Sequence, residues 1–322
     1  MSLSQIRQNA AQRLREDGNP FRKLVFIHTA VTLALSLSLM IIIWLSQYIA
    51  PEGGLSNMGT QTLLSAGQTL LQLLSMILVP FWNAGLSFAV LGMIRRRSIS
   101  PVHLTEGFRR WGSVASSLLL QGLVCFVTAM GCSFACSLLL SLMPLPSFVY
   151  QDLAAFVEAP TVPLSRGVLI FLIIYLVTYG AALCVLLIPK LYQYRLAAYR
   201  IMEDEPCSGL QAIVYSRQWM KGNRRKLFLL DLSFWWFYLL DFGISLLSMG
   251  DLIASEFGAP LPFSQDFAAW IFPIMGMLAR LVLYWFAKPQ LEVSYGLFYE
   301  QAVAESLKEP EPPQPKRMPW KY

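Results

Sequence analysis

Residues 216–240, SRQWMKGNRRKLFLLDLSFWWFYLL, join a basic amphipathic segment directly to an apolar run. The run continues to residue 249 and is long enough to cross a bilayer, because about 20 apolar residues in a helix span the hydrocarbon core. Lysine and arginine next to a membrane helix stay on the cytoplasmic side. This stretch therefore predicts both a membrane helix and the direction in which it crosses.

The composition is that of an integral membrane protein. Hydrophobic residues make up 56% of the 322 residues and charged residues only 14%, and the mean hydropathy is +0.51. A soluble domain carries about 25% charged residues. Six apolar runs are long enough to cross a bilayer, and they comprise residues 24–49, 63–94, 114–142, 168–188, 227–249 and 267–287. The sequence therefore predicts an all-α polytopic membrane protein with six transmembrane helices.

Basic residues gather in alternate connections between these runs. The second and fourth connections contain Arg95, Arg96, Arg97, Arg109, Arg110, Lys190, Arg195, Arg200, Arg217, Lys221, Arg224, Arg225 and Lys226. The other three connections hold one basic residue, Arg166, and several acidic ones. Because positive charge marks cytoplasmic loops, we expect both termini to be cytoplasmic and the protein to lie in the cell membrane.

The net charge of +6 follows from the same arrangement. Basic residues near a membrane boundary are attracted to the anionic lipids of the cytoplasmic leaflet. Binding to nucleic acid would call for base-stacking aromatics among these charges on a soluble domain, and the sequence contains no such domain. Membrane lipids with anionic headgroups are the expected partners, and a second membrane protein is an alternative partner.

Recurring weak motifs predict an internal repeat. Gly18-Asn19 and Gly222-Asn223 each precede basic residues and an apolar run, and Pro80, Pro189 and Pro289 recur near the ends of the returning helices. Each proline is expected to kink its helix. The pattern fits one membrane domain, 1–307, made of three hairpins as parallel repeats, about residues 1–94, 95–201 and 202–307. The alternative, that glycine and proline are simply frequent in membrane helices, stays open.

The chain continues past the membrane on its cytoplasmic side. Apolar and aromatic residues follow the three prolines as far as Ile94, Tyr199 and Tyr299. Such surfaces need burial in water, so we expect these extensions to pack on one another. Residues 308–322 are rich in proline and polar side chains, and they are expected to form a disordered cytoplasmic tail.

The segment before the fifth run has the pattern of a helix lying in the membrane interface. Apolar Leu210, Ile213 and Val214 alternate with polar residues over 210–220, so we expect the apolar face to enter the headgroup boundary. Gly222 is expected to end this helix, since glycine accepts a left-handed backbone. The turn, here named the elbow, comprises Ser216, Met220, Lys221, Gly222, Asn223, Arg224, Arg225 and Lys226. It is either a structural turn or a platform for a lipid headgroup or a partner.

The elbow also carries a resemblance to a known family. Ser216, Met220-Lys221-Gly222-Asn223, Leu227-Phe228-Leu229 and Leu232-Ser233-Phe234 resemble the signature of a bacterial integral-membrane family, domain of unknown function nine hundred seventy-five. The flanking residues Tyr194, Ala197, Tyr199, Pro289, Phe298 and Tyr299 are similar to its patterns on either side. The chain departs from the family pattern at Gln290 and just before Trp235. The resemblance implies a membrane fold and brings no activity with it.

Three ionisable residues lie inside the apolar runs. Asp231 and Asp241 lie four and fourteen residues into the fifth run, and Arg280 lies well inside the sixth. A charge at the bilayer centre costs about 2.5 to 3.5 kcal/mol unless it meets a partner or water. The two interpretations are a salt bridge between Asp241 and Arg280 and a polar cavity for a substrate or ion. Asp231 is a competing partner for Arg280.

The sequence lacks recognisable catalytic and metal-binding motifs. It contains no H-E-x-x-H, G-x-S-x-G or P-loop pattern, and within the membrane only Asp231, Asp241 and His28 could serve as a base. Cys132 and Cys136 have the i, i+4 spacing of a soft metal site, but no histidine lies near them in the sequence. We therefore predict that the protein is not an enzyme and holds no metal or cofactor.

Two functions fit these features. One is a binding or accessory protein of the cell membrane that holds a lipid-like ligand or another membrane protein. The aromatic-rich stretch at 234–238 and the scarcity of polar residues in the spans favour it. The other is a small transporter with a site near Asp241 and Arg280, which the repeat and the helix prolines favour.

Overall fold

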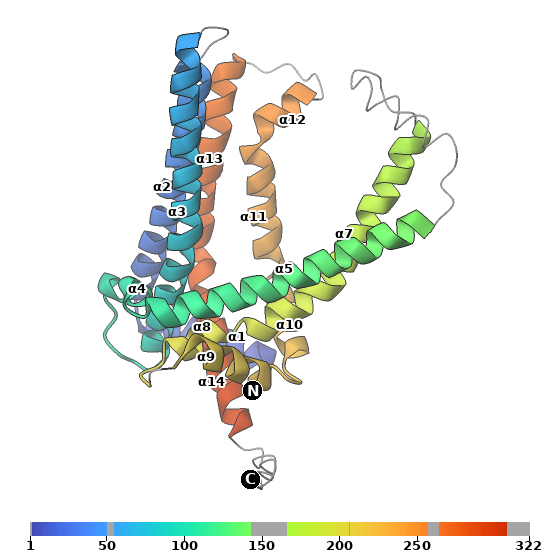
Figure 1. The fold of residues 1–322 in the computed structure, drawn as a ribbon. Coiled ribbons are helices and arrows are strands. Elements are labelled where there is room, and N and C mark those ends of the chain that lie inside the picture. Colours follow the sequence, from blue (N-terminus) through green and yellow to red (C-terminus); the bar gives the residue numbers. More distant parts are fainter. Residues whose placement is uncertain (1, 50–54, 143–165, 206, 257–263, 308–322) are drawn as a thin grey trace, which may run out of the picture.

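The computed structural model describes residues 2–49, 55–142, 166–205, 207–256 and 264–307, in which all regular elements are helices (Figure 1). Five are long and apolar enough to cross a membrane: α2 (Pro20–Ile49), α3 (Leu55–Ile94), α5 (Trp111–Leu142), α7 (Arg166–Tyr194) and α13 (Gln265–Phe286). A sixth span results if α10 (Arg224–Leu232) and α11 (Trp235–Ser248) are counted together. The all-α membrane class is thereby confirmed, with five to six candidate spans.

The fifth predicted span is not one straight helix. α10 and α11 are bent by 60° at Ser233 and Phe234, so the predicted fifth span over 227–249 is a broken helix that counts as one span only if both parts are taken together. The Ser233 hydroxyl donates to the Leu230 carbonyl at 2.6 Å, a local bond that competes with the helical ladder. Phe234 is 1% exposed and its ring faces the Arg7 guanidinium at 5.0 Å. Burial of this ring anchors the bend.

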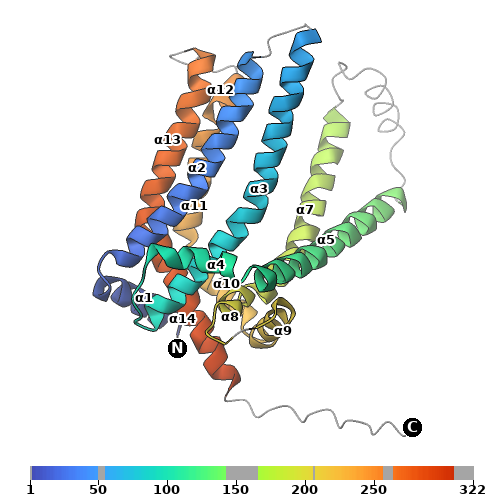
Figure 2. The ribbon, with the colours of Figure 1, turned by 60° about the vertical axis from the view of Figure 1, so that its left-hand side comes forward.

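The spans form antiparallel pairs. α2 packs on α3, α5 on α7, and α11 on α13, and α13 also packs on α2, which joins the first and third pairs into one bundle. α5 and α7 lean away from this bundle and approach the rest of the protein near one end (Figure 2). Many apolar side chains on α5 and α7 are exposed and require a lipid or protein environment. That the three pairs are repeats of one another stays a prediction.

Short helices gather at one end of the spans and form what we call the base (Figure 1). The base comprises α1 (Leu3–Glu16), η1 (Pro101–Thr105), α4 (Glu106–Arg109), α8 (Ala197–Ile201), α9 (Gly209–Trp219), α10 and α14 (Lys288–Ser306). α12 (Gly250–Glu256) lies at the opposite end. The largest fully buried side chains, led by Tyr295, Tyr299 and Phe21, lie in or beside the base. The polar sequence before the first span thus folds into α1, which buries Ile6, Ala10 and Leu14 against the base.

The three prolines mark where spans pass into the base. Pro80 and Pro189 lie inside α3 and α7, whereas Pro289 is the second residue of α14. Pro289 therefore starts a new helix and does not kink a continuous one, which corrects the prediction for this residue. Beyond the prolines, Ile94 of α3 lies against Gly296 of α14, where an added Cβ would come within 2.4 Å of it. The expectation that the extensions pack on one another is confirmed.

α9 forms close to its predicted position, and the elbow follows it. α9 ends at Trp219 with Met220 as its C-cap, so it ends before Gly222; Gly222 has the left-handed backbone, φ +84°, in the turn that leads to α10. The buried side of α9 contains Gly209, Ala212, Ile213 and Ser216, and it packs on α5 and α8. The expectation that Ile213 enters the headgroup boundary was wrong, because the small residues on this side bring α9 onto its neighbours and bury Ile213. The tail at 308–322 lies outside the described residues.

Candidate functional site

Asp241 and Arg280 form an ion pair between α11 and α13. Arg280 Nε donates to Asp241 Oδ1 at 2.8 Å, and Arg280 Nη2 donates to the Ser245 hydroxyl at 2.7 Å. The arginine side chain is 25% exposed and the aspartate 29%. Both charges thus have partners, which is the arrangement that the salt-bridge interpretation requires.

Asp231 pairs with tyrosines rather than with Arg280. The Tyr295 hydroxyl donates to Asp231 Oδ1 at 2.5 Å, and the Tyr192 hydroxyl donates to Asp231 Oδ2. The Tyr238 hydroxyl lies 2.9 Å from that of Tyr295, and the Arg195 guanidinium lies 4.5 Å from the centre of the Tyr295 ring. We call these five residues the Asp231 cluster. They come from the end of α7 and from α10, α11 and α14, so the cluster forms where four helices meet.

Burial fixes the protonation state of Tyr295 within this cluster. Tyr295 is 2% exposed, and burial raises the pKa of its hydroxyl far above its usual range; Asp231 adds to this effect and Arg195 opposes it. The hydroxyl therefore keeps its proton at neutral pH and donates to Asp231. Asp231 thus has two hydrogen-bond donors, whereas Arg195 forms no ion pair with a carboxylate in the described part of the chain.

A groove runs from this cluster between α7 and the α10–α11 bend, and we call it the α7–α11 groove. It holds about 700 Å³ and is lined by Ile188, Leu191, Tyr192, Arg195, Phe228, Asp231, Leu232, Trp235, Tyr238, Leu239 and Phe242. Its polar members all belong to the Asp231 cluster, so the polar groups gather at one part of an otherwise apolar lining. Trp235 is 60% exposed and Phe242 61%. Apolar side chains of α5 and α13 are exposed to a similar extent, as expected for helices that face lipid.

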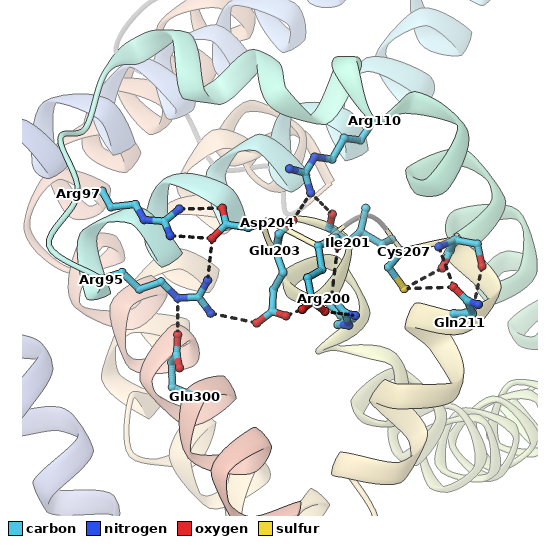
Figure 3. Close-up of polar contacts among 12 residues, drawn as sticks. Arg95, Arg97, Arg110, Arg200, Ile201, Glu203, Asp204, Cys207, Gln211 and Glu300 are labelled. Atoms are coloured by element: carbon cyan, nitrogen blue, oxygen red, sulfur yellow. Dashed lines mark hydrogen bonds and ion pairs between the residues drawn. The ribbon is translucent and has the colours of Figure 1, made fainter. Parts of the chain in front are cut away.

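A separate network of ion pairs links the end of α3 to α14 and to the loop after α8 (Figure 3). Arg95 donates to Glu203 at 3.0 Å and to Glu300 at 2.9 Å. Arg97 makes two bonds to Asp204, at 2.8 and 2.6 Å, and these bonds hold the pKa of the Asp204 carboxyl below its usual range. The sequence predicted these arginines only as cytoplasmic loop charges, and the structure gives them partners on α14 and in the loop after α8.

The elbow residues divide between the core and the surface. Ser216 and Met220 are buried, and the Ser216 hydroxyl donates to the Gln193 carbonyl at 2.9 Å. Asn223 Nδ2 donates to the Trp219 carbonyl at 3.0 Å. Lys226 pairs with Glu305 of α14 at 3.1 Å, so this cation of the elbow is compensated by an acidic side chain. Arg225 and Lys221 are exposed, and Arg224 is half-buried.

His28, the remaining candidate base, contacts α3. Its Nε2 lies 3.0 Å from Asn83 Oδ1, and its ring stacks on Trp82 at 6.2 Å between centroids. The imidazole is 1% exposed. His28 is therefore held inside the α2–α3 pair, and its bonded partners come from α3.

Four members of the Asp231 cluster were not singled out as site residues from the sequence. They are Tyr192, Arg195, Tyr238 and Tyr295. A signal for part of this surface was present, because Arg280, Tyr284, Lys288 and Glu292 recur at every fourth position and Tyr295 follows three residues later. Residues at these spacings share one face of a helix. This polar stripe runs along α13 and α14 and ends at the cluster.

Comparison with known proteins places the chain in a family. The family described as protein of unknown function (DUF975) matches residues 1–306. The chain belongs to this family. The DUF975 match covers all the candidate spans and the base. It confirms the resemblance that was predicted from the elbow residues. No curated protein and no solved structure matches the chain.

Proposed function

We propose that this DUF975 protein is a non-enzymatic lipid-binding protein of the bacterial cell membrane. In this proposal the α7–α11 groove holds the apolar chains of a membrane amphiphile, and the Asp231 cluster contacts its polar head. The observation that carries the proposal is the lining of the groove, in which apolar walls meet the Arg195 guanidinium. This guanidinium makes no direct ion pair among the described residues, although the carboxylates of Asp231 and Glu292 lie close enough to attract it. Arginine makes strong charge-assisted bonds to phosphate and carboxylate groups.

The polar end must supply most of the selectivity. Lipid chains are as apolar as the groove walls, so moving a chain from the bilayer into the groove gains little from the hydrophobic effect. Binding then depends on fit to the walls and on bonds to the head. Arg195 offers donors, and Asp231 holds its position through Tyr192 and Tyr295.

Filling the groove tests this function. Leu239 lines the groove on α11, and Leu246, on the same helix, does not. We expect Leu239→Trp to reduce the lipid that remains bound after purification by about tenfold, a modest loss of binding free energy of about 1.4 kcal/mol. Leu246→Trp should retain wild-type lipid. Native mass spectrometry of the purified proteins measures the bound lipid, and equal occupancy in both variants would rule the groove out.

We further propose that the base faces the cytoplasm, so that both chain ends lie inside the cell. The basic residues of the base support this orientation. In a background without the five native cysteines, Ser98→Cys and Ser208→Cys should resist a membrane-impermeant thiol reagent in intact cells. Ser264→Cys, at the opposite end, should react. Labelling of the Ser208 position from outside would reverse the orientation.

A small transporter is the second candidate, and the polar stripe on α13 and α14 favours it. Lys288 lies in this stripe with its Nζ 4.9 Å from the centre of the Tyr284 ring, and burial lowers the pKa of its amine. A row of ionisable groups leading from Arg280 toward the base could pass protons or small ions. Solute or proton flux into proteoliposomes that is lost in an Arg280→Gln variant shown to be folded would support this function, and the absence of flux for a broad solute panel would count against it.

A further inference from the structure

A pocket separate from the α7–α11 groove lies at the elbow. It holds about 460 Å³ and is lined by Gln193, Val214, Arg217, Gln218, Lys221 and Arg224. These residues come from the end of α7, from α9 and the turn that follows it, and from the first residue of α10. None of them lines the groove.

The charges of this pocket are all positive. Arg217, Lys221 and Arg224 form no ion pair with a carboxylate in the segments that the structure describes. This distinguishes them from Arg95, which is held by acidic partners within the base, and from Lys226, which pairs with Glu305. Three uncompensated cations around one hollow repel one another, so the pocket favours an anion.

Arg224 supplies the most specific observation. Its Nε atom is buried and has no hydrogen-bond partner among the described residues. A buried donor without an acceptor is costly, whereas a bound anion would satisfy it. α10 also begins at Arg224, and the Asn223 side chain does not cap its first turn. The positive end of the helix dipole therefore adds to the charge of the pocket.

We propose that this pocket binds a phosphate group with two or more negative charges, as in a phosphomonoester or a diphosphate. The group belongs either to a lipid headgroup or to a free phosphate compound. A phosphodiester carries only one charge and would leave the three cations less well neutralised. The arginines bind phosphate oxygens through paired N–H groups, and the amides of Gln193 and Gln218 can donate to the same oxygens.

General attraction to the anionic leaflet is the competing explanation, and Arg225 separates the two. Arg225 is exposed on the first turn of α10, next to Arg224, and does not line the pocket. Attraction to the leaflet depends on the total charge near the surface, so substitution of either arginine should weaken it equally. Binding at a specific site in the pocket requires Arg224, and substitution of Arg225 does not change it.

The experiment uses the full chain in nanodiscs of neutral phosphatidylcholine. One arm titrates inorganic pyrophosphate by calorimetry. A second arm replaces part of the lipid with phosphatidic acid, or with phosphatidylglycerol at equal total charge, and measures the thermal unfolding temperature. Each arm is repeated with Arg224→Gln and with the matched control Arg225→Gln. Lys221→Gln, at an exposed residue, serves as a second pocket variant if Arg224→Gln does not fold.

We expect tighter association with pyrophosphate, with phosphatidic acid or with both than with phosphatidylglycerol. Arg224→Gln or Lys221→Gln should weaken this association about tenfold or more, as expected for a lost bond to a charged group. Arg225→Gln should not. Pyrophosphate binding in neutral nanodiscs identifies a free phosphate as a sufficient ligand, and an effect of phosphatidic acid alone identifies a lipid headgroup. Equal effects of the two lipids, equal losses in both arginine variants, or no response to either probe would overturn the site.

Discussion

Replacing Asp241 with asparagine is expected to lower the free energy of unfolding by about 3 to 5 kcal/mol, because the change leaves a positive charge without its partner in an apolar environment. Arg280→Gln should cost a similar amount, since it strips Asp241 of its 2.8 Å bond to Arg280 Nε. Thermal unfolding of the purified variants in the same detergent gives the comparison.

The double variant decides what the pair does. If Asp241 and Arg280 only hold α11 on α13, the combined change should recover much of the loss, because no unpaired charge remains. Ser245→Ala removes one bond to Arg280 and keeps the ion pair, so it should cost only about 1 kcal/mol. Single variants of wild-type stability that lose flux or ligand, without rescue in the double variant, would instead make the pair part of a transport site.

Replacing Gly85 with alanine is expected to lower the free energy of unfolding by about 3 kcal/mol, the upper part of the range for overpacking. An added Cβ at Gly85 of α3 would lie 2.0 Å from the Leu104 carbonyl oxygen in η1, which belongs to the backbone and cannot swing aside. The close approach is reciprocal, because a Cβ at Gly107 would lie 2.0 Å from the Phe81 carbonyl oxygen. The unfolding temperature should fall by on the order of 5 °C.

Gly92 provides the control for this change. It lies on the same helix, and an added Cβ there would have no atom within 4 Å. Gly92→Ala should leave the stability unchanged or raise it by about 0.5 to 1 kcal/mol, since alanine favours a helix over glycine. Equal unfolding temperatures for the two variants would show that α3 and η1 do not pack backbone against backbone.

The spans were predictable because a bilayer imposes a simple rule on length and polarity. The five candidate spans each coincide with a predicted apolar run. Asp241 and Arg280 lie in consecutive runs, so the sequence already put the ion pair on adjacent helices. The bend at Ser233 was not predictable in this way. Hydropathy continues through it, and only the structure shows that the helix breaks there, at a point where Phe234 is buried.

The Asp231 cluster could not be predicted from the sequence for a different reason. Tyr192, Asp231, Tyr238 and Tyr295 are separated by up to 103 residues, 295 minus 192, and they meet only because the spans α7 and α11 converge with α10 and α14 of the base. Tyrosine near a membrane boundary is usually an interfacial anchor, so none of these residues stands out by itself. The cations of the elbow were evident as a group, but only the structure separates the paired Lys226 from the unpaired Arg224.

Photo-crosslinking with a lipid whose acyl chain carries a diazirine tests the lipid-binding account most directly. The lipid is incorporated into membranes that contain the full chain, and the labelled peptides are identified by mass spectrometry. The account predicts that adducts concentrate on the groove residues Leu191, Trp235, Leu239 and Phe242, that excess unlabelled lipid removes them, and that Leu239→Trp prevents them. Even labelling of the exposed apolar residues of α5, α7 and α11, insensitive to competitor and to Leu239→Trp, would contradict it.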